Sequence, residues 1–193
     1  MSNETSVSAV TDTAGMEVAT FGTGCFWCSE ALFETLDGVT NVVSGYSGGH
    51  VSKPTYKEVC EGTTGHAECI QVTYDPKKIT YTALLEAFFR GHDPTSLNRQ
   101  GNDVGTQYRS VVFYHNDEQK KLAEEAKNEL NKSGAYAKPI VTEIVKEEKF
   151  YVAEDYHQDY FAKNPDQGYC AFVIAPKLDK FRKVFHDKLK SNI

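Results

Sequence analysis

Two cysteines three positions apart, Cys25 and Cys28, carry the clearest chemical signal of the sequence. Between them stand Phe26 and Trp27, and the latter is the only tryptophan of the chain. A Cys-x-x-Cys pair that follows a strand and a turn is typical of thiol redox chemistry or of metal binding. The combination of a dithiol with a large aromatic side chain favours redox chemistry on a small substrate.

The elements around this pair favour a reactive thiol. A strand pattern over residues 18–21 leads through the glycine-rich turn 22–24 into a helical pattern that ends near Leu36. Cys25 is therefore expected at the start of a helix, where unpaired backbone N–H groups and the helix dipole stabilise a thiolate. Cys28 lies on the same helix face, within reach of a disulfide. The alternative is that Cys28 simply belongs to the apolar face of that helix.

Composition limits the classes of protein to which the chain can belong. Its 193 residues, 40% hydrophobic and 12% aromatic, suffice for one core but not for two full domains. A formal net charge of −6 without a visible basic stripe argues against nucleic acid or an anionic membrane as a partner. No apolar run approaches the roughly 20 residues of a membrane span, and the first residues lack the pattern of a signal peptide. We expect a disordered tail over residues 1–15, a single catalytic domain over residues 16–193, and a cytoplasmic monomer.

The remaining patterns predict an α+β fold. We expect strands over residues 39–46, 68–74, 110–115 and 139–145, and helices over residues 80–91, 117–132, 153–162 and 178–189. The central elements run strand, helix, strand, strand, helix, strand, which is the ferredoxin-like or split βαβ order. The expected architecture is a ferredoxin-like split βαβ sandwich with a mixed sheet, additional C-terminal helices and long functional loops. The longest of these, residues 91–109, exceeds what packing requires, and such loops tend to carry function.

Six blocks of the sequence, in family order, resemble the A class of peptide methionine sulfoxide reductases, which reduce the S epimer of methionine sulfoxide. The blocks are residues 24–27, 45–49, 54–56, 64–68, 101–110 and 155–160, and the resemblance spans roughly residues 21–185. It implies repair of oxidised proteins by reduction of methionine sulfoxide, with the free amino acid as a further candidate substrate. We expect no organic cofactor, because neither a Rossmann glycine pattern nor a phosphate loop occurs in a fitting context, and we expect no metal. Electrons are expected to come from thioredoxin or from a chemical dithiol.

The chemistry of a sulfoxide requires a thiolate aimed at sulfur and an acid beside the oxygen. The resemblance implies that Cys25 is the nucleophile, that Glu68 is the acid, that Tyr56 and Tyr108 bind the oxygen, and that Asp103 makes a further polar contact. Glu68 begins a predicted strand, where partial burial of its carboxyl would raise the pKa and keep it protonated near neutral pH. The alternative from the residues alone is a strand-end carboxylate that faces water.

The resemblance also implies that Phe26 and Trp27 form an apolar wall for the substrate methyl group, the alternative being that they are simply core residues. Attack by Cys25 leaves a sulfenic acid that a second thiol converts into a disulfide. Many family members have glycine in place of Cys28 and resolve with cysteines near the C-terminus, whereas this chain has Cys28 and a single C-terminal cysteine, Cys170. We expect Cys28 to resolve, with Cys170 as the alternative or as a second exchange step.

Two other functions remain to be tested by the fold. A non-enzymatic zinc module would use Cys25, Cys28, Cys60 and Cys69, although eight residues separate the second pair. A thioredoxin-like dithiol oxidoreductase would share the Cys-x-x-Cys helix start but not the predicted strand order. In the reductase interpretation, Cys60 and Cys69 are expected to be buried apolar residues, and five cysteines at irregular spacing indicate free thiols rather than a disulfide framework.

Overall fold

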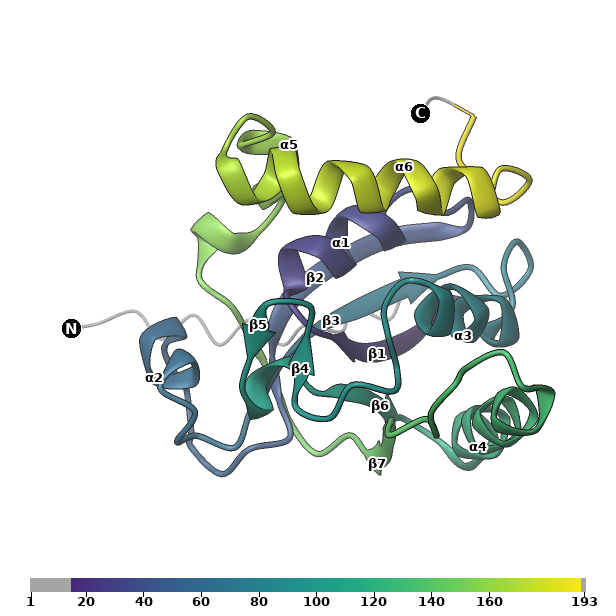
Figure 1. The fold of residues 1–193 in the computed structure, drawn as a ribbon, viewed down its shortest axis with the longest axis horizontal. Helices are drawn as coiled ribbons and strands as arrows, with labels where there is room; N and C mark the ends of the chain where they lie inside the picture. The colour runs from purple at the N-terminus through teal and green to yellow at the C-terminus, as the bar shows by residue number, and fades with distance from the viewer. Residues whose placement is uncertain (1–14, 192–193) are drawn as a thin grey trace.

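The structure, a computed structural model, describes residues 15–191 and is built on a six-stranded sheet of order β7-β6-β1-β3-β2-β8 (Figure 1). The strands are β1 (Glu17–Thr23), β2 (Val39–Ser47), β3 (Ala67–Tyr74), β6 (Ser110–Tyr114), β7 (Glu143–Lys146) and β8 (Phe150–Val152). The four central strands pair in antiparallel fashion in the order β6-β1-β3-β2, and β7 adds in parallel to β6. This is the ferredoxin-like order of a mixed sheet, so the predicted fold class is confirmed.

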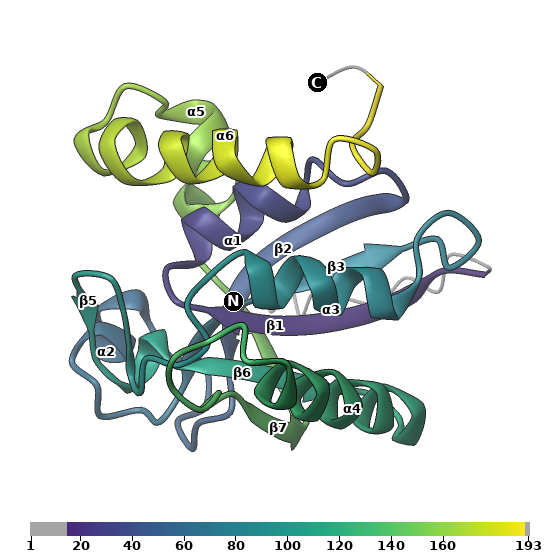
Figure 2. The same ribbon diagram turned by 45° about the vertical axis from the view of Figure 1, so that its right-hand side comes forward.

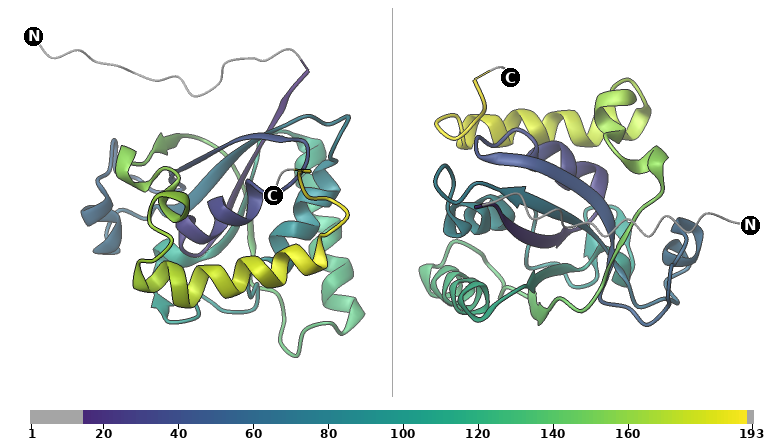
Figure 3. Two further views of the ribbon diagram at one scale, coloured as in Figure 1. Left: turned by 90° about the horizontal axis from the view of Figure 1, so that it is seen from above. Right: turned by 180° about the vertical axis from the view of Figure 1, so that it is seen from behind.

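The long helices lie on one face of this sheet. They are α1 (Phe26–Phe33), α3 (Tyr81–Arg90), α4 (Asp117–Ser133) and α6 (Ala175–Val184). Figure 2 shows α3 and α4 side by side over β1 and β6, and the view from above in Figure 3 places α1 between the sheet and α6. The start of α1 therefore lies in the interior, where strands and helices meet. No helix among residues 15–191 is long and apolar enough to cross a membrane.

Helix α3 shows why these residues adopt these elements. The Thr80 hydroxyl caps it by accepting a hydrogen bond from the Ala83 backbone N–H at 3.1 Å, and Gly91 ends it, as predicted. Its apolar face is buried against β1, where the Phe88 ring lies 5.1 Å from that of Phe21. Burial of such aromatic side chains contributes about 1.5–3 kcal/mol each, which is enough to hold a ten-residue helix against the sheet.

The segment 153–162 differs from the single helix that we expected. It contains only the turn η2 (Asp155–His157) and the start of the short helix α5 (Tyr160–Lys163). The helix is broken because Asp159 has a φ of +55°, and its backbone N–H donates to the carboxylate of Glu30 on α1. The amide group of Gln158 also binds both backbone groups of Ser44 on β2. These contacts hold the segment along the sheet and α1 rather than as a separate helix.

The ends of the chain's helices also differ from expectation. Helix α1 ends at Phe33 because the Thr35 hydroxyl bonds to the Leu32 carbonyl and Leu36 then forms a bridge with Leu189. Helix α6 stops at Val184, before the bridge of Leu189 with Leu36. It begins earlier than expected, as a continuation of a π-helical turn, η3 (Cys170–Ile174). Short elements that we did not expect are α2 (Tyr56–Cys60), β4 (Arg99–Gln100), β5 (Asp103–Val104), η1 (Thr106–Tyr108) and the strand β8. The strand expected over residues 139–145 is present only as the shorter β7. The expected tail falls, apart from Gly15, outside the described residues.

Candidate active site

Cys25 occupies the N-cap position of α1, which confirms the position expected from the sequence. Its carbonyl accepts the first helical hydrogen bond, from the Cys28 backbone N–H at 3.1 Å. The turn before it depends on Gly24, which has a φ of +108° and whose missing Cβ would lie 2.7 Å from the Cβ of Gln100. Cys25 is partly exposed and Cys28 is buried, and both are free thiols.

Glu68 is buried beside this helix start, 1% exposed, on β3. Its Oε1 accepts a hydrogen bond at 3.2 Å from the backbone N–H of Phe26, the residue that follows the nucleophile candidate. Its other oxygen, Oε2, is buried and has no hydrogen-bond partner among the described residues. Burial raises the pKa of Glu68 to about 8, and the charges of Asp103 and Cys28 add to the rise, whereas the Phe26 N–H opposes it. The carboxyl is therefore protonated at neutral pH.

The alternation of β3 separates Glu68 from its neighbour Cys69. Successive strand residues face opposite sides of a sheet, and Cys69 lies in a second apolar cluster with Val111 and Phe113. Its thiol donates to the Gly45 carbonyl at 3.7 Å. Cys69 is buried as predicted, and it faces away from the helix start, so the zinc module is excluded by the geometry of the strand.

Burial dominates the acid–base properties of the cysteine pair. It raises the pKa of Cys25 well above its ordinary value, and the hydrogen bond to Cys28 and the charge of Glu68 raise it further, while the backbone N–H of Trp27 lowers it. The hydrogen bond from Cys25 lowers the pKa of Cys28 despite the burial of that thiol, and the positive charge of Lys177 assists. In the resting pair, Cys25 therefore holds its proton, contrary to the thiolate that we expected at a helix start, because burial outweighs the backbone N–H group; Cys28 is the more acidic thiol.

Tyr56 and Tyr108 lie close enough to Glu68 for its charge to act on both phenols. Tyr56 opens α2 and Tyr108 closes η1, and both side chains are partly buried. Burial is the main reason that the pKa of each phenol lies above its ordinary value. A hydrogen bond to Cys60 and the charge of Glu68 add to the rise for Tyr56, and the charge of Glu68 does so for Tyr108. Both phenols therefore keep their protons and remain donors. Cys60, which we expected to be buried, is exposed, because α2 turns only Val59 toward the core.

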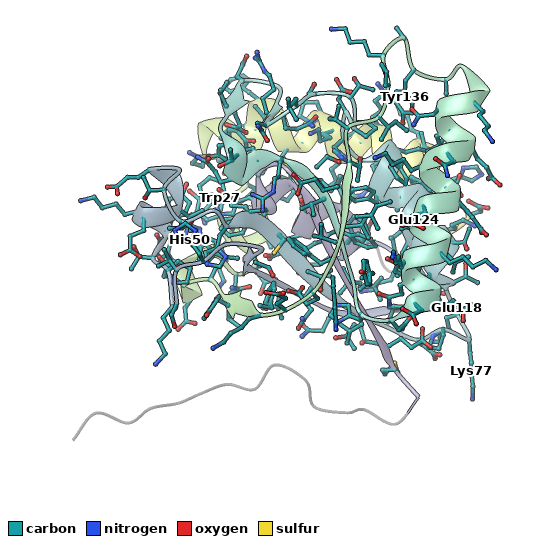
Figure 4. All side chains as sticks on the ribbon, turned by 90° about the horizontal axis from the view of Figure 1, so that it is seen from below. Trp27, His50, Lys77, Glu118, Glu124 and Tyr136 are labelled. Carbon is teal, nitrogen blue, oxygen red and sulfur yellow. The ribbon has the colours of Figure 1, made fainter. Side chains whose placement is uncertain are left out.

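The two aromatic residues between the cysteines play different structural roles. Phe26 is completely buried, with its ring 6.4 Å from that of Tyr56. Trp27 is partly exposed and stacks on Tyr160 at 3.7 Å, and its indole N–H donates to Nδ1 of His157 at 3.0 Å. In Figure 4, Trp27 lies near the middle of the molecule. The exposed part of the expected apolar wall is therefore Trp27, while Phe26 supports the site from beneath.

Tyr169 is a site residue that our sequence reasoning missed. Its hydroxyl donates to Oδ2 of Asp103 at 2.7 Å and lies 3.9 Å from Sγ of Cys28. It thereby joins β5 to α1, and it meets the edge of Trp27 with ring centroids 6.0 Å apart. The one signal in the sequence is its place directly before Cys170; nothing in the sequence indicates its contact with Asp103.

Cys170 lies in the same region as Cys28. It is completely buried in a small apolar cluster with Cys28, Ala31 and Ile174. Burial raises the pKa of Cys170, and the charge on Cys28 raises it further. The structure thus brings both candidate resolving thiols into one cluster at the start of α1.

A carboxylate cluster lies farther along α1. Among residues 15–191, Glu30, Glu34 and Asp159 are the one group of three or more potential metal ligands within 4.8 Å of one another. Glu30 accepts hydrogen bonds from the Ser44 hydroxyl and the Asp159 backbone N–H. Burial raises the pKa of Glu30 to about 7 and that of Glu34 to about 8. These contacts fasten the segment around Asp159 to α1.

Comparisons with known proteins agree on one family. The model of the family "Peptide methionine sulfoxide reductase" matches residues 17–189. The chain is 57% identical over 175 residues to peptide methionine sulfoxide reductase MsrA of Saccharolobus solfataricus, covering 91% of this chain and 98% of that protein. It is 55% identical over 174 residues to the MsrA of Thermus thermophilus, covering 90% of this chain and 98% of that protein.

Solved structures of the same class share the fold. Reduced Mxr1 from Saccharomyces cerevisiae superposes with a TM-score of 0.77 at 41% identity, covering 82% of this chain and 91% of that chain. Methionine sulfoxide reductase A of Corynebacterium diphtheriae superposes with a TM-score of 0.71 at 38% identity, covering 82% of this chain and 79% of that chain. Mxr1 from Saccharomyces cerevisiae in complex with Trx2 superposes with a TM-score of 0.57 at 28% identity, covering 80% of this chain and 91% of that chain. The chain belongs to the peptide methionine sulfoxide reductase family.

Proposed function

We propose that this protein reduces methionine-S-sulfoxide in oxidised proteins to methionine, with Cys25 as the nucleophile and Glu68 as the acid. The observation that carries the proposal is the buried, protonated carboxyl of Glu68, which the Phe26 N–H holds beside the thiol at the start of α1. A sulfoxide oxygen needs such a proton donor before a thiol attacks the sulfur, and general acid catalysis of this kind contributes about 10²–10⁴-fold in rate.

The first step balances without an external proton. Glu68 gives its proton to the sulfoxide oxygen and takes the proton that Cys25 releases, so the carboxyl ends the step protonated again. The Cys25 sulfur attacks the substrate sulfur, and the protonated oxygen then passes to Cys25. The sulfur–oxygen bond of the substrate and the transient sulfur–sulfur bond both break, which leaves a sulfenic acid on Cys25. The methionine sulfur gains two electrons and Cys25 loses two. The unpartnered Oε2 of Glu68 is the atom available for this transfer.

Tyr56 and Tyr108 donate hydrogen bonds to the same oxygen, and Asp103 is a polar contact behind them. Their raised pKa values support this role, because a phenol that stays protonated remains a donor throughout the reaction. Trp27, backed by Phe26, receives the methyl group, whose burial contributes on the order of 1 kcal/mol. A methyl wall on one side and oxygen donors on the other distinguish the two epimers at sulfur.

Recycling uses Cys28. The Cys28 thiol gives up its proton and its sulfur attacks the sulfenic sulfur of Cys25. The hydroxide that leaves takes up that proton as water, and a disulfide between the two cysteines forms. The lowered pKa of Cys28 and its place one helical turn from Cys25 support this order. A dithiol protein of the thioredoxin class then reduces the disulfide, which the structure of the yeast relative in complex with Trx2 supports. Cys170 offers a second exchange step, because it shares a cluster with Cys28.

The remaining proposals concern the protein as a whole. Residues 16–193 act as a single catalytic domain, and the protein works as a cytoplasmic monomer that repairs oxidised proteins. The family match over residues 17–189 supports one domain.

The test is reduction of a peptide that contains racemic methionine sulfoxide, with dithiothreitol as reductant and the two epimers resolved. Wild type should consume the S epimer selectively, and Cys25→Ser should consume neither. The matched control is Cys60→Ser, which removes an exposed thiol and should leave the selectivity for the S epimer intact. Failure of wild type, with its thiols confirmed free, to reduce either epimer would refute the proposal.

A further inference from the structure

A large open groove lies beside the active site, between the loop 91–101, the turn 135–138 and α6. Its volume is about 1080 Å³, and the exposed large apolar side chains of its lining are Leu97 and Val184, which are 68% and 42% exposed. The turn that carries Tyr136 forms one wall, at the end of α4 in Figure 4. Five cationic residues line the groove, and they are Arg90, Arg99, Lys138, Lys177 and Lys180.

The positive charge of the groove is largely uncompensated. Asp93 is the one acidic residue of its lining, and the Asp93 carboxylate is occupied by the backbone N–H and hydroxyl of Thr95 and the hydroxyl of Ser96. Among the described residues, Arg90 alone of the five cations forms an ion pair, with Glu86 on the exposed side of α3. The groove thus gathers five of the 21 lysines and arginines of the chain against one of its 27 acidic residues.

The groove and the active site share the hairpin of β4 and β5. Gln100 lines the groove, and its strand partner on the hairpin is Asp103, which binds Tyr169 in the active site. The Cβ of Gln100 also lies close to the turn before Cys25, because a Cβ added to Gly24 would be only 2.7 Å from it. Lys177 lines the groove as well, and its charge acts on Cys28. The groove therefore borders the turn that leads to Cys25, with the hairpin of β4 and β5 between the two.

We propose that this groove binds an acidic segment of the oxidised substrate protein, next to the methionine sulfoxide in its sequence. The inference rests on the proposed function. The cations come from separate segments around the groove, and Leu97 and Val184 add exposed apolar surface to it. This lining matches an extended peptide whose carboxylates pair with the cations while its apolar groups cover these two side chains. Nucleic acid fits less well, because the remainder of this acidic chain repels a polyphosphate backbone.

The test compares peptides that differ only in the residues flanking a single methionine-S-sulfoxide, which are glutamate, glutamine or lysine. At an ionic strength of about 0.05 M, wild type should show a kcat/KM for the glutamate peptide about three- to tenfold above that for the glutamine peptide. The kcat/KM for the lysine peptide should be lower than both of these values. The preference should fade at about 0.5 M salt, because the Debye length shrinks to about 4 Å.

Paired variants locate the effect. Lys138→Gln combined with Lys180→Gln should reduce the glutamate-to-glutamine ratio toward one. Lys120→Gln combined with Lys121→Gln makes the same change of charge on the exposed face of α4 and should keep the wild-type ratio. An equal loss of the ratio in both variants would assign the preference to net charge and overturn the groove as its site.

The outcomes separate this inference from the function on which it rests. Reduction of the glutamate and glutamine peptides at the same kcat/KM at low salt overturns the groove proposal and leaves the reductase function standing. Failure to reduce any of the peptides refutes the proposed function itself. Inhibition of glutamate-peptide reduction by a single-stranded oligonucleotide, but not by an unoxidised glutamate peptide, would assign the groove to nucleic acid and overturn the proposal.

Discussion

Replacing Glu68 by glutamine should abolish most activity and at the same time make the protein more stable than wild type at higher pH. Glutamine keeps the shape of the side chain and the acceptor for the Phe26 N–H, which lies 3.2 Å from Oε1. It has no acidic proton to give, so kcat/KM should fall by about 10²–10⁴-fold at neutral pH. In wild type, activity should decline as pH rises through about 8, because the carboxyl then loses its proton.

The change in stability follows from the pKa of the buried carboxyl. That pKa is about 8 in the fold, against an ordinary value of 4.5. Because the folded state holds the proton more tightly, the stabilising contribution of Glu68 is complete below about pH 4.5 and is lost as pH rises to about 8. Each pKa unit corresponds to about 1.36 kcal/mol, so the loss between about pH 5.5 and pH 7.5 amounts to about 2.5 kcal/mol. Glu68→Gln avoids this loss.

Thermal unfolding of both proteins at these two pH values measures the effect. For a chain of this size, a difference of about 2.5 kcal/mol moves Tm by roughly 5–10 °C. The difference in Tm between Glu68→Gln and wild type should therefore be larger by that amount at about pH 7.5 than at about pH 5.5. Other carboxyls with raised pKa values, such as Glu30 and Glu34, are present in both proteins, so their titration cancels. Glu124→Gln, on the exposed face of α4, reports the general effect of one negative charge.

A Tm difference between Glu68→Gln and wild type that is the same at both pH values would refute this reasoning. It would mean that Glu68 ionises in the folded protein much as it does in the unfolded chain. The carboxyl would then not be available as an acid at neutral pH, and the source of the proton for the sulfoxide would have to be sought among the phenols.

Other substitutions test the recycling half of the site and the fold around it. Cys28→Ser should complete one turnover per enzyme yet lose at least about tenfold in the rate of thioredoxin-dependent recycling. Full recycling by Cys28→Ser would assign resolution to Cys170, and Cys170→Ser is measured in the same assay for comparison. Tyr169→Phe removes a hydroxyl that helps to lower the pKa of Cys28, so the pH dependence of Cys28 alkylation, followed by mass spectrometry, should move upward. Gly45→Ala would place a Cβ 2.3 Å from Cζ of Phe150 and should cost about 1–3 kcal/mol in urea unfolding. Gly168→Ala, with nothing within 4 Å of the added atom, should change stability by less than about 0.5 kcal/mol.

The central fold was predictable because its signals are local. The cap at Thr80, the stop at Gly91 and the alternation along β3 each fall within a few residues. The order of the central elements then specifies which strands are neighbours. The position of Cys25 at a helix start was predictable for the same reason, since a glycine turn between a strand and an apolar helix is visible in the sequence itself.

The segment after β8 was not predictable, because its conformation depends on distant partners. Its polar and aromatic pattern favours a helix over residues 153–162, yet the backbone N–H of Asp159 is bound by Glu30, which lies 129 positions earlier. The same limit applies to the basic groove. Arg90, Lys138 and Lys177 stand far apart in a chain whose lysines look dispersed, and only the fold assembles them.

Exposure and acidity together indicate which sulfur of a Cys25–Cys28 disulfide a reductant attacks. Cys25 is partly exposed in the reduced protein, whereas Cys28 and Cys170 are buried, so an approaching thiolate meets the sulfur of Cys25 first. That attack expels Cys28, and the lowered pKa of Cys28 makes it the better leaving group of the pair. A thioredoxin that lacks its own resolving cysteine should therefore be trapped on Cys25 when mixed with oxidised protein. Trapping on Cys170 instead would mean that η3 moves to expose this thiol, and that the bond from Tyr169 to Asp103 breaks in every cycle.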